Sequence, residues 1–257
     1  MDVRLIALDL DKTLVHNDGK VSGYSIKILS ECKKRGILIA IATSRSEISA
    51  KEYVDLIKPD IVVTSGGAVA RVGNTVLYKA LIQQDILNSI IQDALGNPSI
   101  ACIRVLGEVH ELSNNQSVPV GQKDCGHYDY SDLQTPLNEN AWKIQFETKD
   151  ISFLKSLQFK YPECELTSYS NEDLHKLANI KANKLDAIMA VCDYYGITLK
   201  ETAAFGDDFS DYKLLKEAGM GVAVANAIEQ IKNVSDFVCD SNEKDGVAGY
   251  IEKYILC

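Results

Sequence analysis

The residues Leu5-Ile6-Ala7-Leu8-Asp9-Leu10-Asp11-Lys12-Thr13-Leu14 decide how the rest of the chain is interpreted. The first four form a short apolar run near the N-terminus, which is more typical of a central strand of an α/β sheet than of a surface helix. Open α/β sheets bind ligands at the carboxyl ends of their strands, and residues two positions apart along a strand face the same way. Asp9 and Asp11 are therefore predicted to share one site, where two close carboxylates need a cation or a shared proton. Taken alone, the pair is also compatible with a solvated acidic strand end.

Composition places the chain among ordinary soluble globular proteins of one or two domains. Its 257 residues are 46% hydrophobic and 25% charged, so a core can form without disulfides or metal staples. The net charge of −9 argues against nucleic acid or an anionic membrane as a partner. No apolar run approaches the roughly 20 residues of a membrane span, and the first residues do not resemble a signal peptide. The seven cysteines are scattered, which favours free thiols in a reducing cytoplasm.

Strands and helices alternate in the first part of the chain. Apolar runs at residues 37–42 and 61–64 follow helices predicted near 22–36 and 46–57. This alternation with fully apolar strands predicts a parallel sheet with right-handed crossovers. The second strand stops at Thr43-Ser44-Arg45 and the third at Ser65-Gly66-Gly67, so each strand ends in residues that can bind an anion or a metal.

The pattern changes between about residues 81 and 177. A helix is predicted at 82–95 and another at 152–161, whereas residues 114–140 are polar and rich in turn formers. Strands are predicted near 100–106, 108–112, 142–147, 164–169 and 174–177. We therefore predict that residues 80–177 form a separate α+β unit, inserted into an α/β domain made of residues 1–79 and 178–257.

The α/β pattern resumes at a helix that opens near Lys184. A strand from Thr202 then runs into the acidic cluster Gly206-Asp207-Asp208-Phe209-Ser210-Asp211. Further strands are predicted at 220–225 and 237–238, before a terminal helix at 245–255. Cations are disfavoured at a helix start, so an anionic neighbour would explain the position of Lys184.

Four motifs of this chain resemble those of the haloacid dehalogenase-like (HAD) phosphohydrolases, in order and in context. They are Asp9-Leu10-Asp11-Lys12-Thr13, Thr43, Lys184 and the 206–211 cluster. The insert lies between the second and third motifs, which is similar to the Cof-type subfamily with its class IIB cap. The resemblance covers residues 1–79 and 178–257, and it implies a Rossmann-like parallel-sheet core with an inserted α+β cap domain of the C2 type.

The resemblance also implies a role for each acidic residue. Asp9 is expected to be the nucleophile, forming an aspartyl-phosphate, and Asp11 the general acid and base. Mg²⁺ is the expected cofactor, bound by the carboxylates of Asp9 and Asp207 and by the main-chain carbonyl of Asp11. Asp211 is expected to orient either the metal's waters or Lys184.

Contacts with phosphate or substrate are expected from Thr43, Ser44, Arg45, Lys184 and Ser210. Thr43 supplies a hydroxyl and nearby N–H groups where a strand meets a helix, which suits a phosphate. In isolation, Thr43 could equally cap a helix and Arg45 could equally form a surface ion pair.

Three positions depart from the usual pattern of the subfamily. Thr43-Ser44-Arg45 replaces Thr-Gly-Arg, Ser65-Gly66 replaces Asn-Gly, and Ser210-Asp211 replaces Asn-Asp. Serine keeps a small polar group at each site but changes its hydrogen-bond donors, so these departures concern substrate contacts rather than the chemistry.

The resemblance implies a cytoplasmic, Mg²⁺-dependent phosphatase acting on small phosphorylated metabolites, with sugar phosphates as the commonest substrates. The alternatives are a phosphomutase or phosphotransferase acting on sugar phosphates, and a metabolite-binding member without turnover. Asp11 argues against a dehalogenase, because that reaction needs no acid for the leaving group. The sequence predicts neither the individual substrate nor the oligomeric state.

Overall fold

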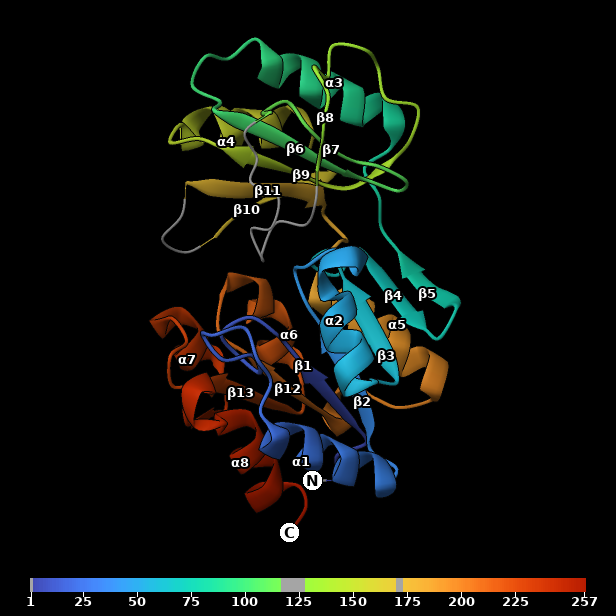
Figure 1. Ribbon diagram of the computed structural model, residues 1–257, viewed down its shortest axis with the longest axis vertical. Coiled ribbons are helices and arrows are strands. Elements are labelled where there is room, and N and C mark those ends of the chain that lie inside the picture. Colours follow the sequence, from blue (N-terminus) through green and yellow to red (C-terminus); the bar gives the residue numbers. More distant parts are fainter. Residues whose placement is uncertain (1, 117–127, 170–172) are drawn as a thin grey trace.

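Two β-sheets organise the molecule, as the computed structural model shows for residues 2–116, 128–169 and 173–257. The larger sheet has the strand order β14-β13-β12-β1-β2-β3-β4-β5, and the smaller has the order β10-β11-β9-β6-β7-β8. Strands from both ends of the chain build the larger sheet, whereas the smaller one comes from a single segment (Figure 1). The larger sheet is the core of the protein, and the smaller belongs to a cap above it in this view.

Six neighbouring strands of the core sheet run parallel. They are β14 (Phe237–Cys239), β13 (Met220–Val224), β12 (Thr202–Gly206), β1 (Leu5–Leu8), β2 (Leu38–Ala42) and β3 (Ile61–Thr64). Strand β1 lies in the middle, and all four of its residues are buried. A strand covered on both faces needs a continuous apolar run rather than an alternating one, which is why Leu5–Leu8 takes this position.

Helices cover the core sheet and connect its strands. They are α1 (Gly23–Lys34), α2 (Glu47–Ile57), α5 (Lys184–Tyr195), α6 (Tyr212–Glu217), α7 (Glu229–Val234) and α8 (Gly246–Tyr254). Three short 3₁₀ helices complete the core: η1 (Leu199–Glu201), η2 (Phe209–Asp211) and η3 (Asn242–Lys244). The side chains of Ser22, Ser46 and Asn183 cap the first turns of α1, α2 and α5, as such residues commonly do.

The β4–β5 hairpin is the feature of the core that the sequence pattern does not predict. Strand β4 (Val69–Val72) pairs antiparallel with β3, and β5 (Thr75–Lys79) pairs antiparallel with β4. The parallel sheet is therefore mixed at this edge. The sequence does contain a hairpin signal, since Gly73-Asn74 connects two alternating segments. In the structure Gly73 takes a φ of +54°, as hairpin turns require.

The cap contains the sheet of β6 (Cys102–Gly107), β7 (Glu111–Ser113), β8 (Asp129–Tyr130), β9 (Ala141–Glu147), β10 (Cys164–Ser168) and β11 (Leu174–Asn179). Helices α3 (Gln84–Leu95) and α4 (Ile151–Lys160) cover the face that points away from the core (Figure 1). Their apolar residues pack on Ile103, Ile144 and Phe146 in a second hydrophobic core. The other face of the cap sheet looks towards the core domain.

The observed elements confirm the expected fold class, an α/β core with an inserted α+β cap. Most predicted elements are present with small shifts at their ends; the strand predicted at 108–112 begins only at Glu111. The short strand β8 falls within the predicted loop 114–140, of which residues 117–127 lie outside the described part of the chain. None of the helices within the described residues has the length and apolarity that a membrane crossing requires.

Candidate active site

The predicted site residues gather where three parallel strands of the core end. Strand β1 pairs with both β12 and β2, with Leu5 opposite Thr202 and Leu38. Asp9 follows β1, Thr43 follows β2 and Asp207 follows β12, so the parallel register alone places them at one edge of the sheet. This edge faces the cap, because Lys143 of β9 donates a hydrogen bond of 2.8 Å to the carbonyl oxygen of Ser44.

Lys184 is the centre of a buried ion-pair cluster at this edge. Its Nζ lies 2.6 Å from Asp9 Oδ1 and 2.6 Å from Asp211 Oδ1, and its side chain is 1% exposed. Burial opposes the ammonium charge, but the two carboxylates outweigh it and raise the pKa of Lys184 above its usual range. These two carboxylates are the anionic neighbours that its position at the start of α5 predicts.

Three buried carboxylates share the cluster with this one lysine. One oxygen each from Asp9, Asp207 and Asp211 lies within 4.8 Å of the others. Burial, only partly offset by Lys184, raises the pKa of Asp9 to about 7. Burial together with the charges of Asp9 and Asp211 raises the pKa of Asp207 to about 9. Besides burial, the three carboxylates share only one nearby positive charge, that of Lys184, so the cluster favours a further cation.

The donor set of the cluster fits a small, hard divalent cation. Asp211 has both carboxylate oxygens engaged, one by Lys184 and the other by the backbone N–H of Asp207 at 3.2 Å. Asp207 Oδ1 accepts from the hydroxyl of Thr13 at 3.2 Å. One oxygen of Asp9 and one of Asp207 therefore have no hydrogen-bond partner among the described residues, and carboxylate oxygens are the ligands that Mg²⁺ prefers.

Gly206 makes the approach of Asp211 possible. A Cβ atom at Gly206 would lie 2.4 Å from Asp211 Cγ, which is far inside contact distance. Any larger residue at this position would push Asp211 away from Lys184 and from the backbone that it binds. Gly206 is therefore needed for Asp211 to reach Lys184.

Asp11 and Arg45 form a bidentate ion pair beside the cluster. Arg45 Nη2 lies 2.6 Å from Asp11 Oδ1, and Arg45 Nε lies 2.9 Å from Asp11 Oδ2. The arginine side chain is 4% exposed and that of Asp11 is 40% exposed. The guanidinium also lies 4.8 Å from the ring centre of Tyr53 and donates to the carbonyl of Ser49. Arg45 is thus a buried residue fixed on several sides, rather than a surface residue.

The loops that follow β2 and β3 are locked to each other and to the start of α5. Thr43 is fully buried, and its hydroxyl accepts a hydrogen bond from the backbone N–H of Arg45 at 3.1 Å. The N–H of Gly66 donates to the carbonyl of Thr43 at 3.0 Å. Gly67 permits close contact with α5, because a Cβ there would lie 2.1 Å from the carbonyl carbon of Asn183. These contacts set the position of Lys184.

The structure therefore brings six of the predicted residues to one edge: Asp9, Asp11, Thr43, Lys184, Asp207 and Asp211. Arg45 joins them through Asp11, and Ser44 contributes its carbonyl to a contact with the cap. Ser210 lies in η2 beside Asp211, and its hydroxyl makes no hydrogen bond to any described residue.

Sequence reasoning missed the cations that the cap presents to this edge. Lys143 reaches the Ser44 carbonyl, and a Cβ built on Gly66 would lie 2.7 Å from Lys176 Nζ. Both lysines are nearly fully buried. A signal existed in the alternation of residues 142–147, whose polar positions define one face of a strand. Alternation alone, however, predicts a solvated polar face.

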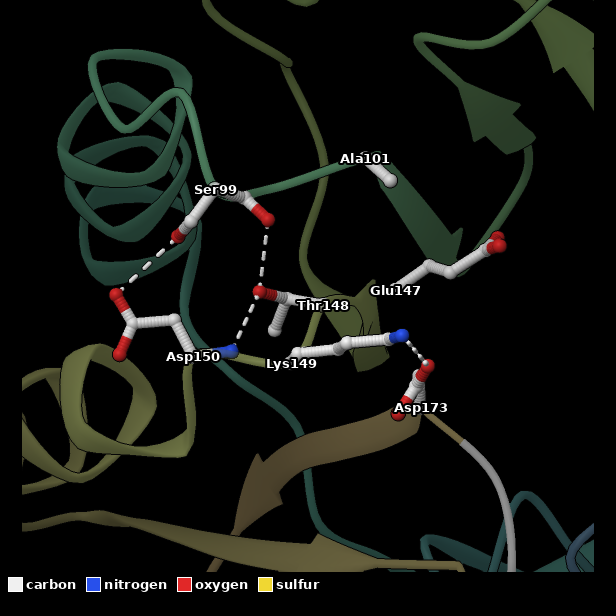
Figure 2. A pocket seen from close by; sticks show the side chains of 7 residues that line it. All are labelled: Ser99, Ala101, Glu147, Thr148, Lys149, Asp150 and Asp173. Carbon is white, nitrogen blue, oxygen red and sulfur yellow. Dashed lines mark hydrogen bonds and ion pairs between the residues drawn. The ribbon is translucent and has the colours of Figure 1, made fainter.

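A separate hollow lies in the cap (Figure 2). It is lined by Ser99, Ala101, Glu147, Thr148, Lys149, Asp150 and Asp173. Its polar side chains already bind one another: Ser99 donates to Asp150, Thr148 donates to the carbonyl of Ser99, and Lys149 lies 3.8 Å from Asp173. Because these groups are satisfied and none of the catalytic candidates lines the hollow, we assign it no role in the chemistry.

Comparisons with known proteins identify the family of this chain. A family model described as haloacid dehalogenase-like hydrolase matches residues 6–251. The chain is 25% identical to the 5-amino-6-(5-phospho-D-ribitylamino)uracil phosphatase YcsE of Bacillus subtilis (strain 168), over 100% of this chain and 97% of that protein. It is 26% identical to the pyridoxal phosphate phosphatase YbhA of Escherichia coli (strain K12), over the full length of both.

A solved structure of the HAD subclass IIB sugar phosphatase BT4131 shares the fold, with a TM-score of 0.87 at 22% identity. The similarity covers 99% of this chain and 100% of that one. The resemblance suggested by the four motifs is thereby confirmed. The chain belongs to the haloacid dehalogenase-like hydrolases.

Proposed function

We propose that this protein is a Mg²⁺-dependent phosphatase that hydrolyses small phosphomonoesters, with sugar phosphates as the first candidates. In this proposal residues 1–79 and 178–257 are the catalytic domain, and residues 80–177 are the cap that selects the substrate. The observation that carries it is the buried cluster in which Lys184 binds Asp9 and Asp211 beside Asp207. The similarity to phosphatases of pyridoxal phosphate and of 5-amino-6-(5-phospho-D-ribitylamino)uracil supports the general reaction.

Asp9 is the nucleophile in this mechanism. Lys184 contacts Asp9 Oδ1 at 2.6 Å; one carboxylate oxygen of Asp9 attacks phosphorus, and the other would contact the metal. Attack forms the O–P bond of an aspartyl-phosphate and breaks the bond to the leaving alcohol, and water then hydrolyses the intermediate. Lys184 also places positive charge where the phosphoryl oxygens gain negative charge in the transition state.

Asp9 and Asp207 would hold the metal through their carboxylates, together with the main-chain carbonyl of Asp11. When bound, Mg²⁺ neutralises negative charge on the phosphoryl oxygens. Asp211 keeps Lys184 in place, because its carboxylate bridges the ammonium group and the backbone N–H of Asp207. Thr43, Ser44 and Ser210 would contact the phosphate or the substrate.

Asp11 acts as general acid and then as general base. It protonates the leaving alkoxide and later removes a proton from the attacking water. Both of its carboxylate oxygens are held by Arg45 in this structure, so the pair must open when substrate enters. The released guanidinium of Arg45 then becomes available to the phosphoryl group, for which its fork geometry is well suited.

A reducing, cytoplasmic location is part of the same proposal. All six cysteines within the described residues are free thiols, and five of them are buried. Proteins of oxidising compartments commonly pair their cysteines. Activity on small metabolites fits the same compartment.

Phosphate release from a panel of phosphomonoesters tests the proposal. Purified protein with Mg²⁺ is expected to release inorganic phosphate from sugar phosphates or pyridoxal phosphate, and EDTA is expected to stop the release. Asp9→Asn keeps the shape of the side chain but removes the nucleophile, so kcat should fall by about 10⁴-fold or more. Full activity in this variant would exclude Asp9 as the nucleophile. Isomerised sugar phosphate without free phosphate would instead identify a phosphomutase.

A further inference from the structure

The face of the cap sheet that looks towards the core carries a row of polar side chains. In β9, Gln145 pairs with Arg104 of β6 on one side and with Lys176 of β11 on the other. Residues directly opposite across strands share a face, so these three side chains form one row. Their neighbours Ile144 and Phe146 point the other way, into the apolar core beneath α3 and α4.

This row is buried and strongly basic. Arg104, Gln145 and Lys176 are 6%, 4% and 5% exposed. Lys143, two residues before Gln145 on the same face, is 4% exposed. Arg104 has an acidic partner in Glu147, whose half-exposed carboxylate lies 3.1 Å from Arg104 Nη2. Glu165 also lowers the electrostatic cost at Lys176, but its carboxylate is bound by Lys213.

Two of these cations each have a nitrogen without a partner among the described residues. Lys176 Nζ makes no hydrogen bond or ion pair with any residue that the structure describes, and Arg104 Nε is buried without an acceptor. Burial, together with the nearby charges of Lys143 and Lys184, lowers the pKa of Lys176 to about 7. A buried cation without a partner is costly, and an anion bound between these groups would remove the cost.

The row lies next to the catalytic edge. Lys176 Nζ sits above Gly66, where a Cβ atom would approach it to 2.7 Å. Lys143 contacts the carbonyl of Ser44, which follows Thr43. A phosphoryl group held at Asp9 would thus have the cap cations on its outer side, where the leaving alcohol of a phosphomonoester must extend.

We propose that Arg104, Lys143 and Lys176 bind a second anionic group, a carboxylate or a second phosphate, on the alcohol part of the substrate. Gln145 assists: its Oε1 accepts from the Tyr128 hydroxyl at 2.9 Å, which leaves its NH₂ group as a donor. This proposal rests on the proposed phosphatase function and narrows its substrate class to phosphomonoesters with an additional negative charge.

Two matched substrate pairs distinguish a second anionic group from none. Phosphoglycolate is compared with 2-hydroxyethyl phosphate, where a hydroxymethyl group replaces the carboxylate. Glucose 1,6-bisphosphate is compared with glucose 6-phosphate. The wild type with Mg²⁺ is expected to prefer the more anionic member of at least one pair by about tenfold or more in kcat/KM. The pair that shows the preference tells whether the group is a carboxylate or a phosphate.

Lys176→Met, with Lys176→Gln as a second variant, is expected to lose this preference mainly through KM. Lys149→Met removes a positive charge from an exposed position of the same cap and should leave the preference unchanged. A wild type that prefers the members without the additional anionic group overturns the proposal. The proposal is also overturned if the Lys176 variants lose kcat/KM equally for both members of a pair, because Lys176 would then act on the transferred phosphoryl group.

Binding to Asp9→Asn, measured by calorimetry with Mg²⁺, separates this proposal from the phosphatase proposal. If the wild type releases no phosphate from any ester, the proposed function fails. The anion site still stands if the variant binds phosphoglycolate or glucose 1,6-bisphosphate about tenfold more tightly than the matched ester without the additional anionic group. Equal binding of both members of each pair overturns it.

Discussion

The acidic edge of the core and the basic face of the cap both contain buried charges, but they differ in whether those charges have partners within the protein. At the core edge the cations have partners: Lys184 binds two carboxylates, and Arg45 binds both carboxylate oxygens of Asp11. On the cap face Lys176 has no partner among the described residues, and Arg104 retains an unsatisfied nitrogen. The core is thus built before substrate arrives, whereas the cap face is completed by what it binds.

Among the substitutions considered, removing Lys184 from the core edge should have the largest effect on stability. Lys184→Met leaves Asp9 and Asp211 buried without a cation, which should lower the free energy of unfolding by about 3–5 kcal/mol. The loss should shrink as the pH falls towards about 5, because the orphaned carboxylates then take up protons. Denaturant unfolding measures both effects. Exposed Lys181 offers a control in Lys181→Met, and equal stability of the two variants would contradict the role of Lys184.

Replacing Asp11 separates the two steps of the proposed chemistry. Asp11→Asn cannot protonate an alkoxide, so kcat for alkyl phosphates should fall by about 10²–10⁴-fold. p-Nitrophenolate leaves without a proton, so rapid mixing should still show a burst of about one p-nitrophenol per enzyme, because the second step still needs a base. Bursts of similar size from alkyl and aryl phosphates would argue against Asp11 as the acid.

Removing Lys176 should have the opposite effect on stability from removing Lys184. Its pKa of about 7 in the folded protein lies below the usual 10.5, so between these values the unfolded chain binds more protons. Native stability thus rises with pH across this window, and the cost of the charge is greatest below about pH 7. Lys176→Met should raise Tm by roughly 3 °C or more near pH 6, with the gain vanishing near pH 10. Calorimetry at both pH values checks this, and a lowered Tm at pH 6 would show that Lys176 stabilises the fold.

The smallest effect is expected at Ser65, in the loop beneath Lys176. Ser65 takes a φ of +55°, a left-handed conformation that asparagine tolerates better than serine. Asparagine is also the usual residue of the subfamily at this position. Ser65→Asn should raise Tm by about 1–2 °C, and a thermal melt that shows a decrease would mean that the buried serine has contacts that outweigh its backbone conformation.

Much of the catalytic edge was predictable because it depends on short-range patterns. The apolar run Leu5–Leu8 predicts a buried strand, and the parallel order of β1, β2 and β12 brings Asp9, Thr43 and Asp207 together. The position of Lys184 at a helix start predicts an anionic neighbour. By contrast, the pairing of Asp11 with Arg45 depends on the path of the loop after β2, which no local pattern specifies.

The sequence by itself determined the strand ends, the four motifs and the presence of an inserted α+β unit, because strand and helix periodicities act over a few residues. Only the tertiary structure decided that the polar face of β9 and β11 is buried. The alternating pattern alone predicts that Lys143 and Lys176 are exposed to solvent. They are buried because the cap packs on the core and places them over Ser44 and Gly66. Burial of a strand face depends on contacts between segments about a hundred residues apart, and no short-range periodicity records such contacts.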